Sequence, residues 1–159
     1  MSEPDSRKDE LLARVRTAHA RLEQLLGKLT PEQFEAETLD GGWSVKATLG
    51  HITWWEQVPL HAITGASDEE ILAGEEWDID RANAKLLERN RARPLGDVRA
   101  DFDASYAALL AALEALPAAR LDALSPYGGT LETLIAGNTY QHYDEHASYI
   151  AVAFGLSLA

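Results

Sequence analysis

The chain has 159 residues, a formal net charge of −12 and no cysteine, which is about the length of one domain. Without cysteine it cannot carry a disulfide framework, a zinc–thiolate site or a cysteine nucleophile. A polyanionic chain is a poor counterion for phosphate, so we expect no nucleic-acid partner. The acidic start has no apolar core and is not a signal peptide, and no apolar run is long enough to span a membrane. We therefore expect a single cytoplasmic domain over residues 1–159.

Alanine and leucine greatly outnumber valine and isoleucine in this sequence. The first pair favours helices, whereas β-branched residues favour strands. Apolar and polar residues nowhere alternate between turn signals, as they do in a half-buried strand. The predicted fold class is all-α.

The first predicted helix runs from about residue 7 to residue 29, with apolar residues every three or four positions. Pro31 then opens a short helical turn. Ser44 is a good N-cap for a second helix. Pro59 lacks a backbone donor and should kink that helix or end it early, and the segment finishes by Gly65.

A third helix is predicted from about residue 78 to 91 and a fourth from about 96 to 116. After a glycine-rich turn, Thr130 caps a last helix that extends over residues 131–154. Four long amphipathic helices predict a four-helix bundle, in which residues 66–95 form a long crossover carrying extra helix.

The sharpest chemical signal is the pair His142 and His146. Residues four apart on a helix are neighbours, and two imidazoles at this spacing can share one metal ion. Their helix face is otherwise mostly apolar, so it should point into the bundle, where unpaired polar groups are costly. The pair is either part of a metal site or a pair of hydrogen-bonded core residues, and the sequence leaves both interpretations open.

The best candidate for a third ligand is His51, which also lies on an inward helix face. Metal sites in bundles are built from facing helices, and three histidines leave the open coordination position that catalysis requires. We expect zinc or nickel, although imidazole suits several divalent metals. His61 is expected at the surface or a pocket rim, and His19 as a solvated helix residue.

The segment from His142 to His146 also matches H-x-x-E-H, the inverted zincin pattern, in which the glutamate would be a general base. A small bundle rich in alanine and leucine is an unusual setting for a peptidase, which makes peptidase the minor interpretation. Glu145 remains the candidate catalytic residue because it borders the histidine face. Its alternative role is that of a surface carboxylate or a carboxylate that orients a ligand.

Two segments resemble the DinB-like superfamily. One contains GWSVK and then LGHITWWE within residues 42–56, and the other is IAGNTYQHYDEH over residues 135–146. The family pattern in the first is a tryptophan, a serine cap, and then a leucine and a histidine on the following turns. The second segment is most similar to the ClbS/DfsB branch.

This resemblance implies a four-helix bundle that holds a divalent metal through three histidines, which by position are His51, His142 and His146. Related members include thiol-dependent S-transferases and a mycothiol-dependent isomerase, so it also implies an external low-molecular-weight thiol and a small electrophile as substrate. ClbS-type members protect cells from a genotoxin, which implies a role in the stress response. Homodimers are common in the superfamily, and we expect one here.

Three functions are compatible with these observations. The first is a metal-dependent S-transferase or hydrolase, with four candidate substrate contacts: Trp54, Trp55, Asn138 and Tyr143. The second is a bundle that binds a toxic small molecule without turnover, with a pocket wall formed by Trp43, Trp54, Trp55 and Trp77. The third is a metal-stabilised dimerisation domain. Turnover of an electrophile in the presence of a thiol separates the first from the second.

Overall fold

The computed structural model describes residues 2–65 and 78–158. Every named secondary-structure element in these residues is a helix. In chain order these are α1 (Glu3–Leu26), α2 (Pro31–Glu35), the 3-10 turn η1 (Asp40–Gly42), α3 (Val45–Thr64), α5 (Ile79–Arg91), α6 (Leu95–Ala115), the 3-10 turn η2 (Ala118–Asp122), α7 (Leu131–Asn138) and α8 (Tyr140–Phe154). The predicted all-α fold is confirmed. None of these helices is both long enough and apolar enough to cross a membrane.

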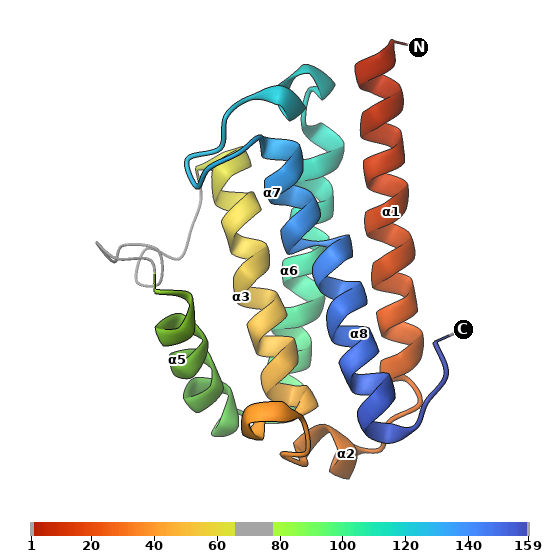
Figure 1. The fold of residues 1–159 in the computed structure, drawn as a ribbon, viewed down its shortest axis with the longest axis vertical. Coiled ribbons are helices and arrows are strands. Elements are labelled where there is room, and N and C mark those ends of the chain that lie inside the picture. The colour runs from red at the N-terminus through yellow and green to blue at the C-terminus, as the bar shows by residue number, and fades with distance from the viewer. Residues whose placement is uncertain (1, 66–77, 159) are drawn as a thin grey trace.

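The bundle consists of α1, α3, α6 and the consecutive helices α7 and α8, with α5 packed outside α3 (Figure 1). Helix α5 is the extra helix predicted for the crossover. Helix α3 is the most enclosed element, because it contacts α5, α6, α7 and α8. A helix that is covered on several sides has interior positions on more than one face, so α3 contributes side chains to two separate polar clusters described below.

The core is one continuous cluster of apolar side chains from all the long helices of the bundle. Its largest fully buried members include Leu22, Leu49, Ile52, Phe102, Leu109 and Ile150. Burial of each such side chain stabilises the fold by about 1.5–3 kcal/mol. This packing fixes α3 and α8 relative to each other.

Helix α3 begins as the sequence predicts, because the Ser44 hydroxyl accepts a hydrogen bond from the backbone N–H of Ala47 at 3.0 Å. The predicted early stop at Pro59 is wrong. The helix continues through this residue to Thr64 and ends where Gly65 takes a left-handed conformation, with φ of 75°. Val58 and Pro59 are buried, so packing outweighs the loss of one backbone donor.

The predicted single helix over residues 131–154 is also wrong, because it is divided at Thr139 into α7 and α8. Thr139 has φ of −123° and ψ of −105°. Its fully buried hydroxyl donates to the carbonyl of Ile135 at 2.6 Å, and a side chain bonded in this way competes with the helix. The backbone N–H of Tyr143 then donates to the Thr139 carbonyl at 2.8 Å. Helix α8 therefore begins as a separate helix within one turn of His142.

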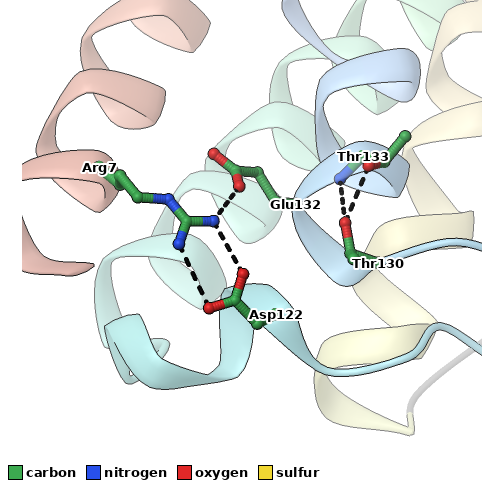
Figure 2. Close-up of polar contacts among 5 residues, drawn as sticks. All are labelled: Arg7, Asp122, Thr130, Glu132 and Thr133. Atoms are coloured by element: carbon green, nitrogen blue, oxygen red, sulfur yellow. Dashed lines mark hydrogen bonds and ion pairs between the residues drawn. The ribbon is translucent and has the colours of Figure 1, made fainter. Parts of the chain in front are cut away.

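An ion-pair network ties the end of α7 to the first helix (Figure 2). The Arg7 guanidinium binds both carboxylate oxygens of Asp122, at 3.2 and 3.0 Å, and also contacts the Glu132 carboxylate. Beside it, the Thr130 hydroxyl caps α7 by accepting from the N–H of Thr133 at 3.2 Å. Exposed ion pairs stabilise by only about 0–1 kcal/mol, so this network mainly fixes the orientation of η2 and α7 against α1.

Helix α5 approaches α3 closely at Gly50. A Cβ atom at this position would lie 2.3 Å from the amide carbon and nitrogen of Asn90. The Asn90 side chain is buried and donates to the carbonyl of Leu86 at 2.8 Å. The close contact between α3 and α5 therefore depends on the missing side chain at Gly50.

We expect Gly50→Ala to lower the free energy of unfolding by about 1–3 kcal/mol, because Asn90 must leave its buried position. Urea unfolding measures this change. Gly96→Ala is the matched control, since no atom lies within 4 Å of its added Cβ and alanine favours the helix by up to about 1 kcal/mol. A second substitution, Asn90→Ala, should recover part of the loss. Equal stability of the two glycine variants would contradict this account of the contact.

Candidate metal centre

Three histidine side chains from two helices converge inside the bundle. His51 comes from α3, and His142 and His146 lie one turn apart on α8. Nε2 of His142 lies 2.9 Å from Nε2 of His51 and 2.9 Å from Nε2 of His146. One ring nitrogen from each residue lies within 4.8 Å of the others, a grouping that no other three potential metal ligands form in the described part of the chain. We refer to these three residues as the histidine triad.

The orientation of His51 is fixed by Asn83 of α5. Nδ1 of His51 lies 3.1 Å from Oδ1 of Asn83, and the same oxygen accepts a hydrogen bond from the indole N–H of Trp55 at 3.1 Å. An amide oxygen only accepts, so Nδ1 of His51 carries the proton and Nε2 keeps a free lone pair. Metal-binding histidines are commonly held in this way, with the second ring nitrogen donating to an oxygen.

All three imidazoles of the histidine triad are neutral at pH 7. Burial lowers the pKa of His51 to about 3, with a further contribution from His146. Burial and the two neighbouring imidazoles lower that of His142 to about 2, and burial lowers the pKa of His146 to about 4. Neutral imidazole is the form that coordinates a metal.

The donor set fits a divalent cation better than it fits hydrogen bonding alone. The Nε2 atom of His142 lies 2.9 Å from each of two other Nε2 atoms. The Nε2 atom of His51 carries a lone pair and no proton. A shared proton satisfies only one of these two contacts, whereas a cation between the three nitrogens satisfies all of them. Tetrahedral zinc, with bonds of about 2.0–2.1 Å, separates its ligand nitrogens by about 3.3 Å, which requires only a small outward shift of the rings.

A cavity of about 830 Å³ opens onto the histidine triad, and we refer to it as the main cavity. His51 and His146 form part of its wall, together with Asn83, Trp43 and Tyr149. The rest of the wall is largely apolar. This volume is in the range of small-molecule sites, which is roughly 300–1,000 Å³.

The tryptophans predicted to contact a substrate lie in different places. Trp55 supports Asn83, and its ring centroid is 6.1 Å from that of His51. Trp54 is buried and lines a second cavity of about 340 Å³ between α3, α5 and α6. Trp43 lines the main cavity. Trp77, the fourth member of the predicted aromatic wall, lies outside the described residues.

The remaining predicted contacts are not in the wall of the main cavity. Asn138 donates its side-chain amide to the carbonyl of Leu134 at 2.9 Å, and Tyr143 is fully buried. Glu145 is exposed and accepts a hydrogen bond from the Tyr149 hydroxyl at 2.9 Å. Because Tyr149 lines the main cavity, Glu145 is linked to the cavity through this tyrosine. The catalytic role of Glu145 stays a prediction.

A second polar cluster, which the sequence did not reveal, lies on another face of α3. The carboxyl group of Glu56 is fully buried and accepts a hydrogen bond from the Tyr143 hydroxyl at 2.5 Å. Burial raises the pKa of Glu56 to about 8. Burial and the adjacent carboxyl group raise the pKa of Tyr143 well above its usual value. Both groups are therefore predominantly protonated at pH 7.

The prediction that His19 is a solvated helix residue is wrong. Its side chain is buried and stacks on Tyr106, with ring centroids 3.4 Å apart. Burial lowers the pKa of His19 to about 4. Its spacing from Val15 and Leu22, four residues before and three after it, places it on the apolar face of α1 and was the signal for burial. Asn83, in contrast, gave no such signal, because its role depends on how α5 docks against α3.

Several solved structures have the same fold as this chain. The colibactin self-resistance protein ClbS, crystallised with double-stranded DNA, has a TM-score of 0.77 and 19% identity, covering 94% of this chain and 96% of its own. An uncharacterised protein from Escherichia coli UTI89 has a TM-score of 0.79 and 16% identity, with coverage of 94% and 95%. A mutant of the mycothiol-dependent maleylpyruvate isomerase has a TM-score of 0.67 and 15% identity, with coverage of 94% and 63%. No curated protein sequence matches this chain.

The expectation that net charge excludes a nucleic-acid partner is wrong, because ClbS has this fold and is crystallised with double-stranded DNA. The physical reason is that net charge is a sum over the whole molecule. Contacts to DNA depend on the local arrangement of cationic and polar groups, which a total of −12 does not describe.

The sequence also matches the DinB superfamily over residues 14–149. This range contains all three residues of the histidine triad and both segments that carry the resemblance. The match therefore covers most of the bundle, and the arrangement of helices agrees with it. The chain belongs to the DinB superfamily.

Proposed function

We propose that this protein binds one divalent metal ion through His51, His142 and His146 and acts as a thiol-dependent transferase or hydrolase on a small electrophile. The observation that carries the proposal is the orientation of His51. Its Nδ1–H is held by Asn83, so that its Nε2 lone pair faces the other two histidines. This is the arrangement expected of a ligand rather than of a core histidine.

The surroundings of the histidine triad support chemistry rather than a purely structural ion. Three protein ligands leave a coordination position open, and two of the triad residues line the main cavity. A divalent ion at this position supplies Lewis-acid chemistry, lowering the pKa of a thiol or of water. The chain has no cysteine, so the thiol comes from solution. The mycothiol-dependent isomerase among the similar folds supports this choice of cosubstrate.

The protein's own residues have distinct roles in this proposal. The histidine triad holds the ion, and Asn83 orients His51. Trp43 and the apolar wall of the main cavity exclude water from the substrate. In this proposal Glu145 and Tyr149, which are joined by a hydrogen bond, accept or relay a proton at the edge of the cavity.

The first test is the metal content of protein purified without a histidine tag or chelator, measured by elemental analysis. We expect about one equivalent of zinc or nickel per chain, and almost none in the double variant His142→Ala/His146→Ala, because a single remaining imidazole binds weakly. His61→Ala is the matched control, since this histidine is not part of the triad. Absence of metal from the unaltered protein, even after zinc or nickel is added, would refute the proposal.

A second candidate function is the binding of a small molecule without turnover, for which the size of the main cavity is the supporting observation. The two functions differ in one assay. With metal and thiol present, an enzyme consumes a chromogenic halonitroarene catalytically. A binding protein instead takes up a fixed number of molecules per chain, and the absorbance then stops changing.

A further inference from the structure

The charged residues in the wall of the main cavity affect which molecules can bind there. The inference drawn from them below rests on the proposed function. The described lining of the cavity includes two carboxylates, Asp40 from η1 and Asp80 from the first turn of α5, and contains no lysine or arginine. A third carboxylate, Glu145, is bonded to the lining residue Tyr149. In the described structure neither Asp40 nor Asp80 belongs to an ion pair that would neutralise it.

The wall of the main cavity therefore combines three kinds of group. His51 and His146 belong to the histidine triad, which would hold the proposed ion. Leu87 and Ile150 are among its apolar side chains. Asp40 and Asp80 are exposed, so they form a negatively charged rim that a bound molecule meets as it reaches solvent.

We propose that the substrate or cosubstrate of this site is an amphiphile with an apolar body whose outer end is cationic or neutral, and that Asp40 and Asp80 select against an anionic outer end. An ammonium group would pair with the two carboxylates, whereas a carboxylate in its place would be repelled and would find no lysine or arginine in the wall. Because the rim is exposed, each charge pair is weak, and the selectivity comes from their sum.

The test uses three thiols that differ only in their outer end: 6-amino-1-hexanethiol, 6-mercapto-1-hexanol and 6-mercaptohexanoate. Their binding to the cobalt-loaded protein is measured from the sulfur-to-cobalt charge-transfer absorption. We expect the amine to bind about tenfold more tightly than the carboxylate, the size expected of two exposed charge pairs, with the alcohol between them. The difference should shrink as the salt concentration rises.

The variant Asp40→Asn/Asp80→Asn should bring the three affinities together. The matched control, Asp97→Asn/Asp103→Asn, removes the same charge from exposed positions of α6 and should keep the ranking. Equal affinities in the unaltered protein, or tightest binding of the carboxylate, would overturn the inference while leaving the proposed metal site intact.

A metal-independent arm separates this inference from the proposed function. Hexylammonium, hexanol and hexanoate are titrated against the metal-free protein, and binding is followed by the tryptophan fluorescence, to which Trp43 in the cavity wall contributes. The same ranking is expected, and the same double variant should remove it. Failure of cobalt to bind, with the ranking retained in this arm, would refute only the metal proposal. No preference in this arm would refute the charge selectivity.

Discussion

The metal-free protein is expected to lose most of its stability between pH 6.5 and pH 4. Burial lowers the pKa values of His51 and His146 to about 3 and about 4 in the folded state, whereas an unfolded histidine titrates near 6.5. Below pH 6.5 the unfolded chain therefore binds protons that the folded chain does not, so the free energy of unfolding falls as the pH falls. Each such histidine contributes about 3 kcal/mol to this loss.

Urea unfolding of the metal-free protein at pH 7 and pH 4.5 measures the effect. The triple variant His51→Gln/His142→Gln/His146→Gln should lose much less stability over the same interval, and His61→Gln should behave like the unaltered protein. Zinc should raise the melting temperature at pH 7 by mass action but not at pH 4.5, where protons compete with the ion. A pH dependence that the triple variant retains in full would contradict the assignment to these histidines.

Glu56→Gln is expected to remove a second loss of stability, which occurs as the pH rises from about 5 to 8. Burial raises the folded-state pKa of Glu56 to about 8, well above that of an unfolded glutamate. Between these two values the folded state binds the extra proton, so the contribution of Glu56 to stability is greatest below the unfolded pKa and declines until the pH passes 8. The decline amounts to on the order of 4 kcal/mol between pH 5 and pH 8. Glutamine does not titrate and should show none of it.

The measurement is urea unfolding at pH 6 and pH 8.5 of the unaltered protein, of Glu56→Gln and of the exposed control Glu10→Gln. The amide of Glu56→Gln replaces a protonated carboxyl of similar shape, but at pH 6 the unfolded glutamate is already ionised, so the variant should already be about 2 kcal/mol more stable than the unaltered protein. At pH 8.5 this difference should be larger. Equal pH dependence in all three proteins would show that Glu56 is not the group responsible.

The helices and the histidine triad were predictable because the information that determines them is local. Ser44 and Thr130 cap the helices that the sequence assigned to them. The four-residue spacing of His142 and His146, on a face that is otherwise apolar, indicated that both point into the bundle. The prediction that His51 faces them came from bundle geometry and the family resemblance together, and the structure brings the three residues to one point.

The parts that were missed depend on packing between helices. Asn83 is an ordinary polar residue of α5 until α5 docks on α3 and brings it to His51. Glu56 carries a charge that predicts exposure, yet α3 is covered on several sides, so this residue is fully buried. The break at Thr139 follows from a side-chain hydrogen bond to Ile135, and a sequence with continuous helical periodicity gives no sign of it.

The two helices that carry the histidine triad lie far apart in the sequence, and this has a consequence for the topology of the chain. His51 and His142 are separated by 91 positions, so an ion shared between them would close a long loop. In a chain without cysteine, such an ion would be a reversible cross-link, comparable in its effect on the unfolded chain to a disulfide. Closing a loop of this length removes about 4–5 kcal/mol of chain entropy from the unfolded state. The concentration of available metal would then determine the free energy of unfolding of the whole bundle.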